Sequence, residues 1–83
     1  MLELIFHTDN GHGWIEVSKS LVKKFGTRVS QFSYEKDDKV FLEEDCDAGR
    51  FLKALKDDGI EVKIVGKNFN GSHPIRNYNR YRG

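Results

Sequence analysis

The carboxy-terminal stretch carries side chains suited to binding charged or aromatic groups. The eleven residues from His73 to Gly83 contain three arginines and two tyrosines and no acidic residue. Arginine guanidinium groups bind carboxylates and phosphates through paired hydrogen bonds, and tyrosine rings stack on bases or fill protein interfaces. The sequence therefore predicts a contact surface in this stretch. Its members are Arg76, Tyr78, Arg80, Tyr81 and Arg82.

A second charged cluster lies in the middle of the chain, where Glu43, Glu44, Asp45 and Asp47 surround Cys46. Carboxylates that converge in a cleft can perform acid–base chemistry or bind a divalent cation. Solvation, helix capping and the helix dipole also explain glutamates that end a strand and aspartates that begin a helix. We expect these four carboxylates to be partner-binding residues and not catalytic ones.

The two clusters have opposite charge in a chain whose net charge is only +1. Residues 1–60 contain nine Lys/Arg and twelve Asp/Glu, whereas residues 61–83 contain five and one. If the clusters fold together, they neutralise each other; if they face outward, each can attract a partner of opposite charge. The sequence leaves both alternatives open.

The histidines and the single cysteine could bind zinc, but their spacing does not favour it. Only His7 and His12 lie near each other, across a glycine-containing loop, while Cys46 and His73 are distant. Structural zinc sites usually take pairs of ligands from within a few residues. The acidic neighbours of Cys46 would raise the pKa of its thiol, and a helix N-terminus would oppose that effect. We expect no metal, no cofactor and no enzymatic activity.

Alternation of apolar residues, helical periodicity and turn residues predict a series of short elements. The predicted strands are Leu2–Phe6, Trp14–Val17, Gln31–Glu35, Val40–Glu43 and Ile60–Val65, and the predicted helices are Lys19–Phe25 and Ala48–Asp57. A final strand over Arg76–Tyr81 would place Arg76, Tyr78, Arg80 and Arg82 on one face. His12 and Trp14, at the end of the first hairpin loop, are further candidate binding residues.

Capping residues delimit the two predicted helices. Ser18 or Ser20 caps the first helix and Gly26 ends it, while Asp45 or Asp47 caps the second. The order of elements predicts an α+β fold with a single antiparallel sheet of about five strands and two short helices on one face. Because 83 residues provide apolar surface for only one core, we expect one domain over residues 1–83.

The composition of the chain indicates its cellular compartment and argues against some classes of partner. One cysteine cannot form an internal disulfide, and no apolar stretch is long enough for a membrane span or a signal peptide. These features predict a cytoplasmic protein without a membrane partner. The sequence pI of about 7.9 argues against a dedicated nucleic-acid-binding domain.

Four blocks of the sequence carry a resemblance: His12 to Val17, Phe32 to Tyr34, Val40 to Ala48 and Ile75 to Tyr78. The chain resembles a group of small uncharacterised proteins of bacteriophages and mobile elements, with the Glu-Glu-Asp-Cys-Asp-Ala segment the most specific block. No activity of that group is known to carry over. The resemblance implies a host-cell cytosolic setting, in which single-domain proteins often act by stoichiometric binding.

The leading hypothesis is therefore a non-enzymatic accessory protein that binds a host protein. An inhibitor of a defence complex, such as a CRISPR or restriction complex, is one such protein. The alternative is a small DNA- or RNA-binding protein that uses the arginines and tyrosines of the carboxy terminus. A small enzyme built on His12 and the carboxylates is the third hypothesis. A homodimer could also form through an exposed terminal strand.

Overall fold

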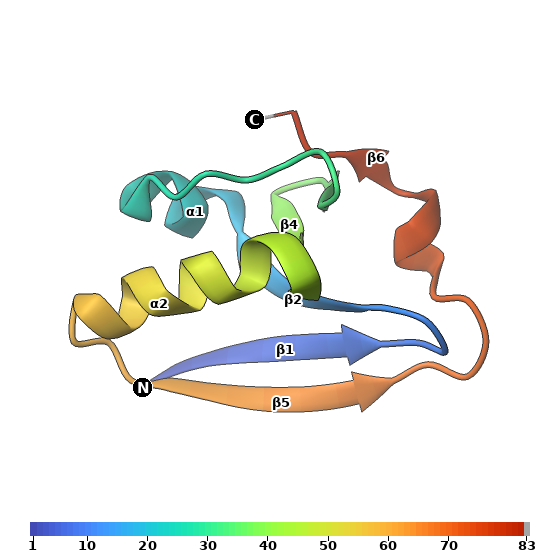
Figure 1. Ribbon diagram of the computed structural model, residues 1–83, viewed down its shortest axis with the longest axis horizontal. Helices are drawn as coiled ribbons and strands as arrows, with labels where there is room; N and C mark the ends of the chain where they lie inside the picture. Colours follow the sequence, from blue (N-terminus) through green and yellow to red (C-terminus); the bar gives the residue numbers. More distant parts are fainter. Residues whose placement is uncertain (83) are drawn as a thin grey trace.

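The computed structural model describes residues 1–82, which form one six-stranded sheet with two α-helices (Figure 1). The strands are β1 (Leu2–Thr8), β2 (Gly13–Ser18), β3 (Tyr34–Lys36), β4 (Lys39–Glu43), β5 (Val62–Asn68) and β6 (Asn79–Arg80). The helices are α1 (Lys19–Phe25) and α2 (Gly49–Asp57), with a π-helical turn η1 (Glu44–Ala48) and a 3-10 turn η2 (Pro74–Asn77).

The strand order is β5-β1-β2-β4-β3-β6, and every neighbouring pair is antiparallel except β1 and β5. The parallel pair runs in register from Leu2 opposite Val62 to Thr8 opposite Asn68. It arises because the connection from β4 through α2 carries the chain over β2 and β1 to the far edge. The predicted α+β class is confirmed, and the sheet is mostly antiparallel with this one parallel pair.

Helix α1 has the predicted bounds, and local capping explains them. The Ser18 hydroxyl accepts a hydrogen bond from the backbone N–H of Leu21 at 3.2 Å. Gly26 ends the helix with φ of 60°, a left-handed conformation that glycine adopts without steric cost. Of the two serines that could cap this helix, Ser18 is the one that does so.

Most predicted strand boundaries differ from the structure, and the largest differences are in β3 and β5. Residues 31–33 form a turn, so β3 begins only at Tyr34. The β3–β4 turn has Asp37 at φ of 55°, a conformation that aspartate tolerates better than most residues. Strand β5 begins at Val62 and continues to Asn68, because pairing with β1 extends it past the last alternating apolar residue.

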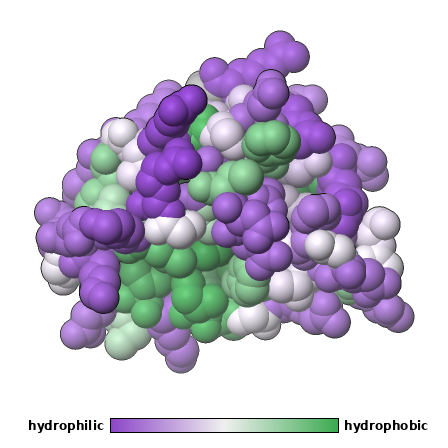
Figure 2. All heavy atoms as spheres, viewed as in Figure 1, coloured by the Kyte–Doolittle hydropathy of each residue, from purple (hydrophilic) through white to green (hydrophobic). Residues whose placement is uncertain are grey.

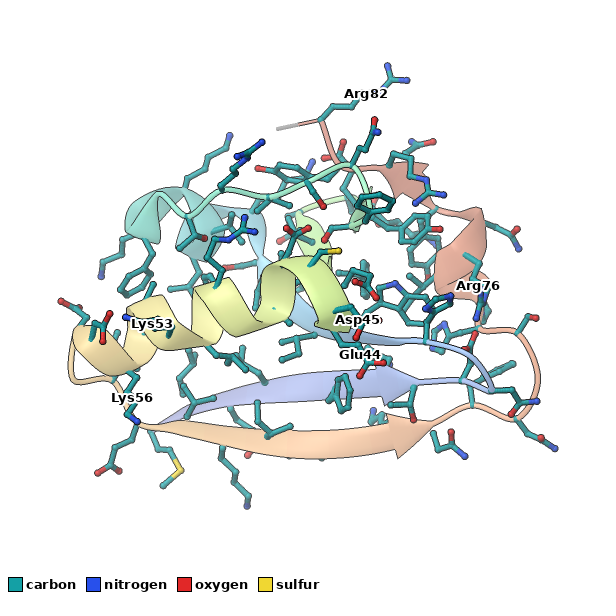
Figure 3. All side chains as sticks on the ribbon, viewed as in Figure 1. Glu44, Asp45, Lys53, Lys56, Arg76 and Arg82 are labelled. Atoms are coloured by element: carbon teal, nitrogen blue, oxygen red, sulfur yellow. The ribbon has the colours of Figure 1, made fainter. Side chains whose placement is uncertain are left out.

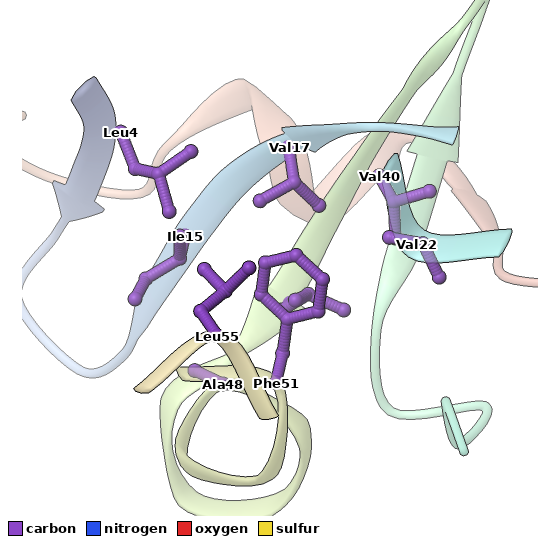
Figure 4. Close-up of a cluster of buried hydrophobic side chains, with 9 residues drawn as sticks. Leu4, Ile15, Val17, Val22, Val40, Ala48, Phe51 and Leu55 are labelled. Atoms are coloured by element: carbon purple, nitrogen blue, oxygen red, sulfur yellow. The ribbon is translucent and has the colours of Figure 1, made fainter. Parts of the chain in front are cut away.

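The main core lies between the sheet and the helices (Figure 4). Phe51 and Leu55 are four residues apart in α2, so both point from one face of the helix toward the sheet. The buried members of this core are Leu4, Ile15, Val17, Val22, Val40, Leu42, Ala48, Phe51 and Leu55.

A second, smaller cluster lies on the opposite face of the sheet. Trp14, Tyr34 and Phe41 come from three neighbouring strands, and Ile75 of η2 packs against them. The segment after β5 leaves one edge of the sheet and reaches β6 at the other edge, so it crosses this face. The carboxy-terminal stretch therefore forms part of the fold.

Helix α2 leaves part of the sheet uncovered. An apolar area is visible below the helix, over β1 and β5 (Figure 2). Ile64, on the outer strand β5, is 44% exposed.

The packing of η2 predicts that alanine variants of two isoleucines differ strongly in stability. Ile75 is completely buried, so Ile75→Ala should lower the free energy of unfolding by about 2–5 kcal/mol. Ile64→Ala removes the same atoms from a half-exposed site and should cost at most about 1 kcal/mol. Urea denaturation of both variants measures the difference. Equal losses would show that η2 does not contribute to the folded core.

Candidate functional site

The loop between β1 and β2 is joined to the carboxy-terminal segment by the carboxylate of Asp9. Oδ1 accepts hydrogen bonds from the backbone N–H groups of Gly11 and His12, at 3.0 and 2.9 Å. Oδ2 accepts one from the backbone N–H of His73 at 2.9 Å. The Arg76 guanidinium donates from Nε to Oδ2 at 2.6 Å and from Nη2 to Oδ1 at 2.9 Å. One carboxylate thus positions both His12 and Arg76.

These bonds act on the ionisation of Asp9. The Arg76 guanidinium, helped by the three backbone N–H groups, holds the pKa of Asp9 well below its ordinary value. The same contact raises the pKa of Arg76. The two side chains therefore remain an ion pair over the whole neutral range.

Gly13 allows the residues after the loop to lie close to their neighbours. A Cβ atom at this position would lie 2.7 Å from ring atoms of Phe6 and 3.0 Å from Oε2 of Glu44. Both distances are too short for an ordinary carbon contact. Glycine between His12 and Trp14 is therefore required for the loop to pack against Phe6 and the start of η1.

The acidic cluster begins at the end of β4. Glu43 is the cap of η1, because its Oε2 atom accepts a hydrogen bond from the backbone N–H of Asp45 at 2.9 Å. The expected cap at Asp45 or Asp47 is wrong, since the helical turn begins at Glu44, one turn earlier than predicted. Glu44 and Asp45 are exposed at this end of the helix (Figure 3).

Asp47 has a different environment from its acidic neighbours. It is 1% exposed, and its Oδ2 atom accepts hydrogen bonds from the hydroxyls of Ser30 and Ser33 and from the Ser30 backbone N–H. The Ser33 hydroxyl in turn accepts from the backbone N–H of Glu43 at 3.0 Å. This network ties residues 30–33 to the end of β4, and Asp47 is placed to hold the fold and not to touch a partner.

The two charged clusters and the β1–β2 loop meet at a pocket of about 430 Å³. Its lining residues come from four segments that are far apart in the sequence. They are His12, Trp14, Phe32, Tyr34, Glu43, Asp45, Cys46, Arg76 and Arg80. We call the surface formed by these nine residues the pocket face. It contains six of the eleven candidate binding residues.

The remaining candidates of the carboxy terminus lie elsewhere. Tyr78 packs against the ring of Phe41, and Tyr81 packs against the core on the helix side. Arg82 is exposed and points away from the body of the protein (Figure 3). The predicted alternation over Arg76–Tyr81 is wrong, because Pro74 begins a 3-10 turn and only Asn79–Arg80 are extended.

The acidic and basic clusters share the pocket without pairing with each other. Arg76 is paired with Asp9, while the Arg80 guanidinium lies 4.6 Å from the Tyr34 ring centroid. Within residues 1–82, no ion pair shorter than 4.0 Å joins an arginine of residues 76–82 to an acid of residues 43–47. Charges of both signs therefore line one pocket.

Sequence reasoning did not name three lining residues, Phe32, Tyr34 and Cys46, as binding residues, and it also missed Asp9. Phe32 was expected in a strand but lies in the 31–33 turn and is 56% exposed. Two turn-favouring serines, Ser30 and Ser33, flank it and could have indicated the turn. The position of Asp9 two residues before Gly11 is typical of an Asx turn, but nothing in the sequence predicts its contact with Arg76.

The Cys46 thiol of the pocket is held in its protonated form, which is less reactive than the thiolate. Desolvation, followed by the Glu43 carboxylate and the charges of Asp47 and Asp45, raises the pKa of the Cys46 thiol. Ligand atoms of His12, Glu43 and Asp45 lie within 4.8 Å of one another. His12, expected to be a partner-binding residue, is thus grouped with two carboxylates.

Comparison of the chain with protein-family models, curated proteins and solved structures found no match. Among residues 1–82, the helices are too short and too polar to cross a bilayer.

The Asp9 contacts predict a pH-dependent loss of stability in Asp9→Asn. The pKa of Asp9 in the folded protein lies below its unfolded value of about 3.9. Its contribution to the free energy of unfolding is therefore full above that pH and declines as the pH falls below it. Asp9→Asn should lower the unfolding temperature by several degrees at pH 7, and the difference from the parent should shrink at pH 3. Thermal unfolding at both pH values measures this. Asp58→Asn, at an exposed site, is the matched control.

Proposed function

We propose that this chain is a non-enzymatic binding protein that attaches to a partner protein through the pocket face. The observation that supports this most strongly is the convergence, from four distant segments, of aromatic rings and of opposite charges that do not pair with each other. Arginine and aromatic side chains dominate the binding energy of many protein interfaces. Charges of both signs at fixed positions favour a partner with a complementary pattern.

Phe32 is the main apolar anchor of this surface. It is 56% exposed, and it lies between the pocket and a second hollow of about 290 Å³ that it shares with Gln31 and Arg80. The Arg80 guanidinium is held over the Tyr34 ring and donates a hydrogen bond to the carbonyl of Gln31 at 3.4 Å. An exposed ring beside a positioned guanidinium is typical of an interface hot spot.

A nucleic-acid partner is the second candidate, because bases could stack on Phe32 and on the Tyr34–Arg80 pair. The charges of the pocket favour protein instead. Arg76 is already neutralised by Asp9, and the carboxylates of Glu43 and Asp45 line the same pocket and repel phosphate. Only Arg80 among the lining residues is then left to attract a nucleic-acid backbone.

The resemblance to bacteriophage and mobile-element proteins supports a host protein as the partner. A protein of this size can cover a standard interface of about 800 Å² with one of its faces. Binding at that scale suffices to block a larger complex, so inhibition of a host defence complex, such as a CRISPR or restriction complex, is the proposed consequence.

Two anchor substitutions test the proposal. Affinity capture from host lysate, with and without nuclease treatment, identifies the partner, and titration then measures its affinity. Phe32→Ala and Arg80→Ala should each weaken binding at least about 10-fold. Phe69→Ala and Arg28→Ala replace exposed residues of the same types outside the pocket face, and they should leave the affinity nearly unchanged.

Two results would overturn the proposal. One is equal affinity for the anchor variants and their controls, which would move the binding surface elsewhere. The other is capture that is lost after nuclease treatment, together with tight, salt-sensitive binding of oligonucleotides by the purified chain. That pair of results would assign the pocket face to nucleic acid.

A further inference from the structure

We propose that His12, Glu43 and Asp45 bind one divalent transition-metal ion, for which Zn²⁺ is the best fit. The three side chains offer one ring nitrogen and two carboxylate oxygens, all within 4.8 Å of one another. These are the ligand types that zinc takes when one coordination position is left open. The three ligands belong to the pocket face, but metal binding is tested on the chain alone, with no partner protein present.

The distances are close to those that a bound ion requires. Nδ1 of His12 lies 3.9 Å from Oε1 of Glu43. Zinc bonds of about 2.0–2.2 Å in a tetrahedral site place neighbouring ligand atoms roughly 3.4 Å apart. The side chain of His12 is 49% exposed and Asp45 is also exposed, so small rotations of either side chain can close the difference.

The backbone already holds the three ligands in place. The N–H of His12 donates to Asp9, and the N–H of Asp45 donates to Oε2 of Glu43. These bonds fix the positions from which the imidazole and the Asp45 carboxylate extend, while leaving both side chains free to turn. A site with a fixed backbone loses little further freedom when it binds an ion.

Glu43 is the observation that points to a cation. Its side chain is 10% exposed, and of its two oxygens only Oε2 has a backbone donor. The sole ion-pair partner of Oε1 within residues 1–82 is the distant Nδ1 of His12. The ligand oxygen of Asp45 lies near that of Glu43, and a positive charge between the two carboxylates would attract both. A divalent ion at Oε1 supplies that charge.

The donor set favours zinc over magnesium or calcium. Imidazole nitrogen is a good ligand for zinc, whereas magnesium and calcium prefer oxygen ligands alone. Cys46 also lines the pocket, but it is not part of the group whose ligand atoms lie within 4.8 Å. We therefore assign the remaining coordination position to water and not to the thiol.

Calorimetric titration of the full chain with Zn²⁺ tests the site. The parent should bind one equivalent, and an excess of Mg²⁺ should not displace it. His12→Ala and Asp45→Asn should each weaken zinc binding at least about 10-fold. Cys46→Ser should bind zinc like the parent, and Asp58→Asn is the control for loss of a surface carboxylate.

A second measurement needs no variant. In nuclear magnetic resonance spectra, addition of Zn²⁺ should shift the ring signals of His12 and leave those of His7 and His73 in place. The inference is overturned by the absence of saturable one-to-one binding, by displacement with Mg²⁺, by loss of binding in Cys46→Ser, or by equal shifts of all three histidines. Because no partner protein is present, none of these results depends on the proposed function.

Discussion

The carboxylate of Asp9 is the interaction on which the pocket depends. It accepts hydrogen bonds from backbone N–H groups of its own loop. It also accepts hydrogen bonds from His73 and Arg76, which lie 64 and 67 positions further along the chain. Without it, nothing described in residues 1–82 would pair with the Arg76 guanidinium, and the loop that carries His12 would lose its internal turn. Because an isolated charge beside the protein interior is unfavourable, Asp9 and Arg76 stabilise each other and the two segments together.

The second constraint is the path of the carboxy-terminal segment across the sheet. A sheet with helices on one face leaves the other face to be covered, and here Ile75 and Tyr78 cover Trp14 and Phe41. This explains why part of the arginine- and tyrosine-rich stretch belongs to the architecture. The same path brings Arg76 and Arg80 to the edge of the cluster, where they can also line a pocket.

Local sequence signals predicted the elements that local interactions determine. The first hairpin, helix α1 and the α+β class follow from alternation, from the Ser18 cap and from Gly26. The parallel pairing of β1 and β5 depends on contacts about 60 residues apart, which no local pattern encodes. The carboxy-terminal alternation failed because Pro74 and the His73 cap favour a helical turn over an extended strand.

The site itself could be predicted only in part, for the same reason. Charge and residue type identified Arg76, Arg80, Glu43, Asp45 and His12, since these properties are visible without a structure. Their convergence depends on long-range folding, on the Asp9 contact and on the Asp47 network that turns Phe32 outward. Residue type alone also could not separate Asp47, which is buried, from its exposed neighbours.

Three departures from ordinary folding rules lie at this pocket. The indole N–H of Trp14 is buried without a hydrogen-bond partner, Glu43 is nearly buried beside other acids, and Phe32 is exposed. Others lie elsewhere, because Oγ1 of Thr27 and Oδ1 of Asp47 are also buried without a hydrogen-bond partner. Proteins usually keep such departures where function requires them, because each one lowers stability. The exposed Phe32 ring and the unpartnered indole N–H of Trp14 therefore favour the proposal that the pocket face binds a partner.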